Sequence, residues 1–359
     1  MSISSYEDFW KVNAKCMGLG KDIPRVPVSL FLNGDWICEF LKLDCQLWYG
    51  NYEFQQSMRD KCSEMTEREL GHKIPHDVDF GVVMDASIYG GEVHCSKNAT
   101  PVLKPVINDA EEIDAFIEKA EKIDFLSAGL IPTYLEWRER IRKDYGVQLQ
   151  YGDAIKGCAT TLGQLCGITN FCEWTLTEPE AIDKLAQCWC DTTIKYVEAI
   201  REATGYEPTG KFSITSDVTS FLPPYVYKDL IMERELAVYE RFAGGPKDVR
   251  YYHADNHLMH ILPYLREIGV REFNIDPYVQ AKDILDVVPD AVIYGQIPPT
   301  QVLLYGTPQD VRECVRRDIE QAGASRQIII CPAGSVNPGT SFDNLRAMCE
   351  AVEEFGYIY

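Results

Sequence analysis

The sequence predicts an α/β fold, and within that class a single closed (β/α)8 barrel with an N-terminal helical extension. Short segments rich in β-branched and aromatic residues alternate with longer segments of helical periodicity, about eight times in all. Several of the short segments end in polar residues, which in barrel enzymes gather at the C-terminal ends of the strands. No G-x-G-x-x-G motif follows a predicted strand, which argues against the alternative, a doubly wound dinucleotide-binding sheet.

The composition indicates a globular protein that binds neither nucleic acid nor a membrane. The 359 residues are 46% hydrophobic, and the formal net charge is −20, whereas a surface for nucleic acid or anionic lipid needs clustered Lys and Arg. No apolar run reaches the roughly 18 residues of a membrane helix, and the N-terminus lacks a signal-peptide pattern. The 13 cysteines include no C-x-x-C pair and suit buried thiols. We expect a soluble protein of a reducing, anaerobic cytoplasm.

The first part of the chain is mainly helical. The predicted elements are helices over residues 5–20 and 36–70 and strands over 26–32 and 79–85. The second strand ends in the carboxylate of Asp85. The many aromatic residues of the second helical segment are expected to pack in the core or in a homodimer contact.

The middle of the chain adds three helices and one strand. They are helices over 108–124, 128–144 and 177–204 and a strand from 147 that ends in Gly152-Asp153. Asn108-Asp109 suits a helix start, Gly146 a helix stop, and Pro179 the first turn of the long helix.

The last part of the chain repeats the strand–helix unit without a linker. Strands are predicted over 211–217, 248–252, 272–276, 291–297 and 327–331, and helices up to 242 and over 308–322 and 341–355. The strand over 248–252 is followed at once by His253, Asp255 and His257, which can bind metal or transfer protons. We therefore predict one domain over 1–359, with the extension and first strand in 1–75 and the remainder of the barrel in 76–359.

Several segments of the chain are similar to the uroporphyrinogen decarboxylase superfamily, in particular to its corrinoid-dependent methyltransferase branch. They include H-A-D-N-H at 253–257, Y-G-Q-I-P-P-T-Q-V at 294–302 and C-P-A-G-S-V-N-P-G-T at 331–340. Weaker similarity extends over most of the chain from Asp22 onward. The resemblance implies a (β/α)8 barrel, in agreement with the strand–helix pattern.

The resemblance also implies a zinc ion, held in this branch by a His-x-Cys pair and a later Cys at a strand end. His253 falls on the histidine and Cys331 on the later cysteine, whereas Asp255 stands at the position of the middle cysteine. An oxygen ligand makes zinc a harder Lewis acid and suits a thiol-activating site less well. The change leaves three alternatives open, namely an altered site, a metal site shifted to other residues, or none.

Other residues at predicted strand ends are candidates for catalysis or binding. Asp217 and Asp153 could complete the metal set or donate a proton to the leaving group, and the alternative for each is a helix cap. Gly334 and Tyr294 are predicted to approach the cofactor or substrate. For His253 and Cys331 the alternative is a hydrogen-bonded core histidine and a buried thiol, and for Asp255 it is a residue that orients His253 without binding the metal.

The predicted function is zinc-dependent transfer of a methyl group between a small methylated compound and a separate corrinoid (cobalamin) protein. The methylated compound would be a methoxy aromatic, a methylamine or a methylated thiol, and Asp255 favours the first. One alternative is a decarboxylase acting on a tetrapyrrole, which the absence of arginine after Arg25 in the segment up to residue 36 disfavours. Another is a non-catalytic barrel that binds a corrinoid or its carrier protein.

Overall fold

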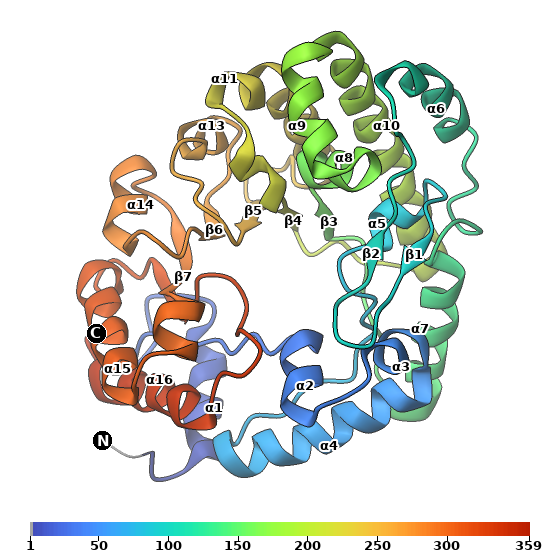
Figure 1. Ribbon diagram of the computed structural model, residues 1–359. Helices are drawn as coiled ribbons and strands as arrows, with labels where there is room; N and C mark the ends of the chain where they lie inside the picture. The colour runs from blue at the N-terminus through green and yellow to red at the C-terminus, as the bar shows by residue number, and fades with distance from the viewer. Residues whose placement is uncertain (1–2) are drawn as a thin grey trace. The chain divides into compact units, whose positions relative to one another are not determined.

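The computed structural model describes residues 3–359 of the chain (Figure 1). The chain forms two compact units. The first comprises Met1–His76, Ala254–Leu262 and Arg271–Tyr359, and the second comprises Asp77–His253 and Pro263–Val270. The prediction of a single domain over 1–359 with an extension over 1–75 stays a prediction. Within the described residues, no helix has the length and apolarity required to cross a membrane.

The first unit contains three parallel strands in chain order, covered by helices. The strands are β6 (Glu272–Ile275), β7 (Val292–Ile297) and β8 (Ile328–Pro332), and β7 pairs with both of the others. The helices are α1 (Tyr6–Cys16), α2 (Gly34–Leu41), α3 (Cys45–Gly50), α4 (Tyr52–Leu70), α14 (Ala281–Val287), α15 (Pro308–Asp318) and α16 (Phe342–Phe355), with the π-helical turns η4 (Pro299–Leu304) and η5 (Ile319–Gly323). Every residue of β8 is buried, which explains its continuous apolar run.

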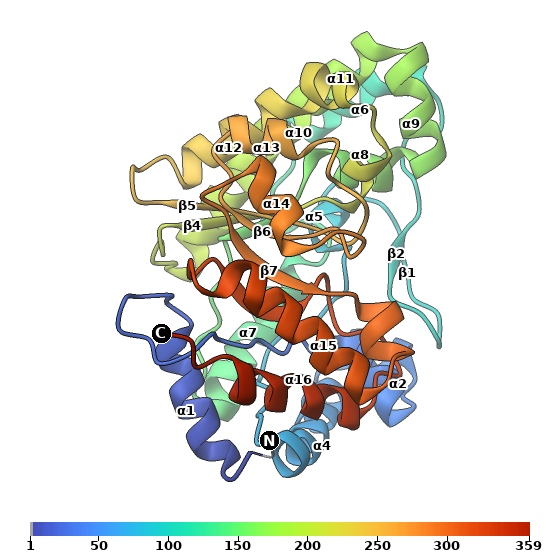
Figure 2. The ribbon, with the colours of Figure 1, turned by 90° about the vertical axis from the view of Figure 1, so that its left-hand side faces the viewer.

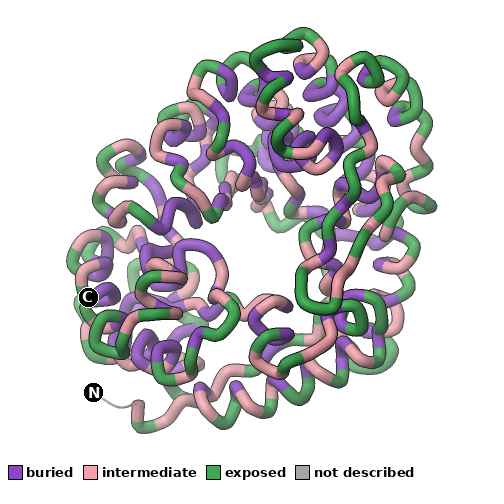
Figure 3. Tube along the Cα trace, in the orientation of Figure 1, coloured by how far each residue is buried: buried purple, intermediate pink, exposed green. Residues whose placement is uncertain are grey.

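The helices α15 and α16 lie side by side in this unit (Figures 1 and 2). Each begins at a side chain that caps its first turn. The Thr307 hydroxyl accepts from the Asp310 N–H while the Asp310 carboxylate accepts from the Thr307 N–H, and Ser341 caps α16. Along their length the helices alternate between buried and exposed residues (Figure 3), as expected where one face of a helix packs on the core.

The second unit also contains three parallel strands in chain order. They are β3 (Ala154–Lys156), β4 (Lys211–Thr215) and β5 (Val249–Ala254), whose last residue belongs to the first unit. The helices are α5 (Met84–Ser87), α6 (Ile113–Ala120), α7 (Ile131–Tyr145), α8 (Cys158–Cys166), α9 (Ile168–Thr177), α10 (Pro179–Thr204), α11 (Pro224–Val226), α12 (Glu233–Phe242) and most of α13 (Leu262–Glu267), with the short turns η1 (Ala110–Glu112), η2 (Asp217–Phe221) and η3 (Tyr227–Met232). A small antiparallel pair, β1 (Val93–His94) and β2 (Val102–Leu103), completes the unit.

The first predicted strand, over 26–32, is reduced to a single parallel bridge between Val28 and Ile330. The Ser29 N–H donates to the Ile330 carbonyl at 2.8 Å, and the Ile330 N–H donates to the Pro27 carbonyl at 2.9 Å. Pro27 has no N–H to extend the ladder, so the pairing stays short.

The second predicted strand, over 79–85, is wrong. The Asp79 carboxylate accepts from the Gly81 N–H at 2.8 Å and closes a local turn instead. Asp85 then lies in the first turn of α5 rather than at a strand end.

The predicted strand from 147 to Asp153 is also wrong, since β3 begins only at Ala154. The carbonyls of Leu149 and Gly152 accept hydrogen bonds from the side chains of Arg138 and Arg201, at 3.0 and 2.8 Å. These carbonyls are therefore satisfied by arginine side chains where the prediction had placed a strand.

Within the first unit, Arg25 links helix α1 to the segment around Val28, which pairs with β8. Its guanidinium group is fully buried, lies 4.2 Å from the Phe9 ring centre, and donates to the carbonyls of Phe9 and Val26 and to the Asn13 side chain. Asn13 in turn exchanges two hydrogen bonds with the backbone of Val28, at 2.7 and 2.8 Å. Arg25 thus holds the segment that pairs with Ile330.

We predict that Arg25→Met lowers the free energy of unfolding by roughly 3 kcal/mol, because several buried acceptors lose their donor. Chemical denaturation followed by circular dichroism measures the change. Lys11→Met, which removes an exposed ion pair with Glu7, is the control and is expected to leave the denaturation curve unchanged. Equal curves for wild type and Arg25→Met would contradict the structural role of Arg25.

Candidate functional site

The ends of β4 and β5 bring two of the predicted site residues together within the second unit. Thr215 of β4 is aligned with His253 of β5, and the Ser216 N–H donates to the His253 carbonyl at 2.9 Å. Asp217 follows in the first position of η2. Because the two strands are parallel and in register, Asp217 and His253 lie at the same carboxyl end of the strand pair.

Asp217 and His253 each offer a ligand atom, and these two atoms lie within 4.8 Å of each other. Asp255, two residues farther along the chain, is the third residue of this candidate group and offers a carboxylate oxygen. Asp217 and His253 are half-buried, and Asp255 is exposed. One imidazole nitrogen and two carboxylate oxygens are a set of donors that binds Zn²⁺ in proteins.

His253 does not point into the core of its strand pair. Its neighbours Tyr252 and Ala254 are both fully buried, and successive side chains of a strand point to opposite faces. The His253 imidazole therefore lies on the face away from these two buried residues, which argues against the alternative of a simple core histidine.

Gly334 leaves room for the Asp255 carboxylate. It adopts a φ of +119°, and a Cβ at this position would lie 2.5 Å from the Asp255 Oδ1. The Gly334 N–H donates to the Asn274 Oδ1 at 3.0 Å, which holds the loop in place. The structure thus sets Gly334 beside a candidate metal ligand, while its predicted contact with a cofactor stays a prediction.

Cys331 lies within β8 as a buried thiol. Burial raises the pKa of this thiol far above its ordinary value. The Asn274 Nδ2 lies 3.8 Å from the sulfur and also donates to the carbonyls of Tyr294 and Pro332. Within residues 3–359 the candidate metal group consists of Asp217, His253 and Asp255, so Cys331 as a ligand stays a prediction.

Tyr294 lies in the interior of β7 rather than at its end. Its hydroxyl donates to the Glu272 carboxylate at 3.1 Å, at the first residue of β6. Burial and the Glu272 charge raise the pKa of the Tyr294 hydroxyl well above its ordinary range. The hydroxyl is therefore directed to the amino end of β6, away from the end where a barrel site is expected.

The predicted placement of Asp153 at the carboxyl end of a strand is wrong. Asp153 precedes β3, and its carbonyl accepts from the Ser213 N–H at 2.8 Å. Asp217 lies four residues beyond Ser213, so at about 3.3 Å per residue the two aspartates are separated by roughly 13 Å along the strand direction. Asp153 therefore does not join the Asp217–His253 pair.

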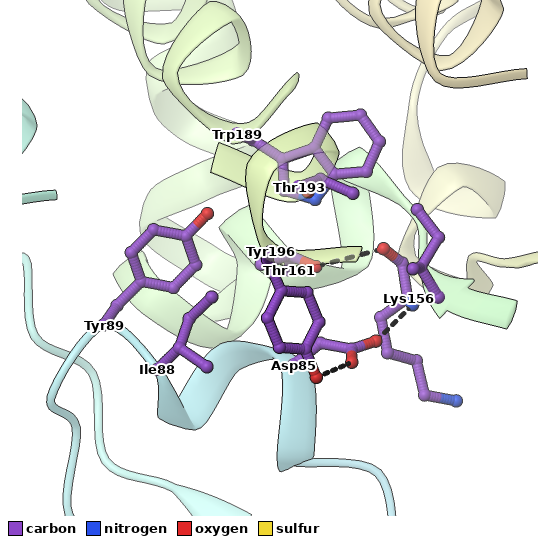
Figure 4. Close-up of a pocket in the computed structure, with 9 residues that line it drawn as sticks. Asp85, Ile88, Tyr89, Lys156, Thr161, Trp189, Thr193 and Tyr196 are labelled. Carbon is purple, nitrogen blue, oxygen red and sulfur yellow. Dashed lines mark hydrogen bonds between the residues drawn. The ribbon is translucent and has the colours of Figure 1, made fainter. Parts of the chain in front are cut away.

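Asp85, although not at a strand end, forms a half-buried polar cluster of its own in the second unit (Figure 4). Its carboxylate accepts from the Tyr196 hydroxyl at 3.3 Å and from the Lys156 N–H at 2.6 Å, both drawn in Figure 4. It also accepts from the Tyr151 hydroxyl at 2.6 Å. The cavity beside it, which Trp189 also lines, holds about 10 Å³, roughly the room for one water molecule. These contacts join α5, β3 and α10, so Asp85 has a structural role that its predicted strand did not indicate.

Comparisons with known proteins show what the chain resembles. The family model described as uroporphyrinogen decarboxylase (URO-D) matches residues 78–355. The chain is 24% identical to a methylated-thiol–coenzyme M methyltransferase of Methanosarcina mazei, over 77% of this chain and 71% of the relative. It is 22% identical to the methylcobamide:CoM methyltransferase MtbA of Methanosarcina acetivorans, over 81% of this chain and 84% of the relative.

A solved structure of a methyltransferase from Methanosarcina mazei matches the fold. It superposes with a TM-score of 0.70 at 19% sequence identity and covers 96% of this chain and 98% of its own. The superposition and the family match confirm the predicted α/β barrel class. Together with the two relatives, they also confirm the resemblance to the methyltransferase branch of the superfamily.

We predict that Gly334→Ala weakens the binding of Zn²⁺, because the new methyl group would displace the Asp255 carboxylate from its present position. Gly339→Ala is the matched control, since Gly339 also has a positive φ, of +89°, but a Cβ there would meet only the Leu304 side chain. Backbone strain of about 1 kcal/mol is expected in both variants. Competition with a chelator measures zinc affinity, and equal affinities in the two variants would contradict the role given to Gly334.

Proposed function

Because the chain belongs to the uroporphyrinogen decarboxylase (URO-D) family, we propose that it is a zinc-dependent methyltransferase that works with a corrinoid protein. The methyl group would pass between a small methylated compound and the corrinoid of a separate partner protein. The observation that carries the proposal is the group of Asp217, His253 and Asp255 at the carboxyl ends of β4 and β5. The names of the two relatives, a methylated-thiol and a methylcobamide methyltransferase, support the reaction class.

The donor set fits zinc in a catalytic rather than a structural role. We propose His253, Asp217 and Asp255 as the three protein ligands, which leaves one position of a tetrahedral ion for substrate. When bound, zinc supplies a Lewis acid that polarises the heteroatom carrying or accepting the methyl group. The family resemblance implies Cys331 as a ligand; the proposed donor set does not include it, and the Cys331→Ala variant below tests this difference.

The ligand atoms of the site favour one class of methylated substrate. Two carboxylate ligands make the site harder than one built from thiolates, and hard sites favour oxygen donors. This supports a methoxylated aromatic compound ahead of a methylamine or a methylated thiol. The carboxylate of Asp255 is exposed, so the proposed site is accessible from solvent.

The buried state of Arg25 weighs against decarboxylation of a tetrapyrrole. It is the arginine of the segment before residue 36, and its guanidinium group is fully buried among protein acceptors. It therefore offers nothing to the carboxylates of such a substrate. The non-catalytic alternative, a barrel that only binds a corrinoid or its carrier, is separated from the proposal by the transfer experiment below.

The cellular setting that we propose is a reducing, anaerobic cytoplasm. It is supported by the burial of all the cysteines except Cys95 and Cys172, since reducing compartments preserve thiols. A homodimer stays a prediction, based on the aromatic residues of segment 36–70, which could form a contact between two copies of the chain.

We predict about one zinc per chain in protein purified without a metal-binding tag, and its loss in His253→Ala and Asp217→Ala. His260→Ala is the control, because His260 lies in the same stretch but outside the donor group. Zinc content is measured by elemental analysis of the folded proteins under reducing conditions. Cys331→Ala is expected to keep its zinc. A folded wild-type protein without zinc would overturn the metal site.

We predict that the zinc-loaded protein transfers a methyl group between cobalamin and one of three donor classes, namely methoxylated aromatics, methylamines and methylated thiols. Cob(I)alamin with each donor tests one direction, and methylcobalamin with coenzyme M tests the other, both followed by the cobalamin absorption spectrum. Removal of zinc by a chelator should abolish transfer, and added zinc should restore it. Turnover of a porphyrinogen without metal, or tight binding of a corrinoid protein without any transfer, would contradict the proposal.

A further inference from the structure

Glu235, at the start of α12, is a fully buried carboxyl group that the proposed reaction does not use. Its Oε1 accepts from the Cys158 N–H at 3.2 Å, and its Oε2 accepts from the Tyr227 hydroxyl at 3.0 Å. Cys158 is the first residue of α8, so the carboxyl group lies at the N-terminus of that helix. Burial raises the pKa of Glu235 to about 7. Such a group is costly to bury, and it calls for an explanation.

A chain of buried hydroxyl groups leads from Glu235 to the ends of β4 and β5. The Tyr252 hydroxyl hydrogen-bonds Glu235 and lies 3.0 Å from the Thr219 hydroxyl. Thr219 donates to the Ser216 Oγ at 2.8 Å, and the Thr160 hydroxyl lies 3.3 Å from the same oxygen. All of these groups belong to the second unit.

Two members of this hydrogen-bonded network are sequence neighbours of two candidate metal ligands. Tyr252 precedes His253, and Ser216 precedes Asp217. Tyr252 and Ser216 are fully buried while His253 and Asp217 are half-buried, as expected where successive side chains of an extended chain point to opposite faces. Whatever fixes Tyr252 and Ser216 therefore also fixes the backbone that carries the two ligands.

Gly157 shows how closely the network is packed. A Cβ on Gly157 would lie 2.8 Å from the Glu235 Oε1 and 2.5 Å from the Ser216 Cβ. Its N–H donates to the Thr215 carbonyl at 2.8 Å, at the last residue of β4. The start of α8, Glu235 and the end of β4 are thus in direct contact, with no room for a side chain at Gly157.

We propose that Glu235 is a positioning residue which, through Tyr252, Thr219 and Ser216, sets the separation of Asp217 and His253 and so the metal affinity of the site. The inference rests on the proposed function in one respect, that these two residues bind a metal. Hydrogen-bond partners behind metal ligands commonly change affinity by about 10- to 100-fold when they are removed. In this proposal Glu235 acts indirectly, through the residues at the ends of β4 and β5 that precede the two ligands.

The test compares metal binding in Glu235→Ala, Glu235→Gln and Tyr252→Phe with the wild type. The zinc dissociation constant is measured by chelator competition well below the unfolding temperature, and the visible spectrum of bound Co²⁺ reports the geometry of the ligands. We expect Glu235→Ala and Tyr252→Phe to weaken zinc binding about tenfold or more and to alter the Co²⁺ spectrum. Glu235→Gln, which keeps one acceptor, should restore part of the affinity.

Tyr196→Phe is the matched control. Tyr196 is also a buried tyrosine of the second unit, but its hydroxyl donates to the Asp85 carboxylate of α5 at 3.3 Å and not to the ends of β4 and β5. This variant should lower thermal stability and leave both the zinc affinity and the Co²⁺ spectrum unchanged.

The outcomes separate this inference from the proposed function. Tyr252→Phe is the mildest variant, and it tests the link even if Glu235→Ala does not fold. If it has wild-type zinc affinity and an unchanged Co²⁺ spectrum, the role of Glu235 alone is overturned. A wild-type protein that binds no zinc, or binds it without regard to His253, would overturn the metal site and this inference together. Weakened binding in Tyr252→Phe, with an unchanged control, supports both.

Discussion

The candidate site depends above all on the parallel register between β4 and β5. Thr215 is aligned with His253, and the hydrogen bond from the Ser216 N–H to the His253 carbonyl carries this register past the end of β4. A shift of one residue would turn His253 into the core and bring Tyr252 to the other face. The buried partners of the strand ends therefore contribute to the chemistry, because they prevent such a shift.

Much of this arrangement could be predicted from local sequence. The strand of Phe212 and Ile214 shows the alternation of a half-buried strand, and polar residues follow it where a barrel places its functional groups. The same reasoning located His253 and Asp255. Glu235 could not be found in this way, since a carboxylate in a helical segment gives no sign that it will be buried against residues more than 70 positions away.

The failures have a common physical cause. Asp153 was misplaced because the apolar–polar alternation before it is equally compatible with a loop, and only the tertiary bonds from Arg138 and Arg201 decide between them. Asp85 was misplaced because a local turn closed by Asp79 competes with extension. Periodicity reports which residues can be buried, whereas the partner of each backbone carbonyl is decided by contacts that are distant in sequence. The family resemblance implies Cys331 as a ligand, and nothing in its local sequence indicates the burial that raises the pKa of its thiol.

The central claim is that zinc is held by nitrogen and oxygen atoms of Asp217, His253 and Asp255. X-ray absorption at the zinc edge of the purified protein, under reducing conditions, tests this claim most directly because sulfur and lighter ligands differ in distance. The claim predicts ligands at about 2.0–2.2 Å that include one imidazole and no sulfur. A sulfur ligand at about 2.3 Å, or the absence of zinc from the folded protein, would contradict it.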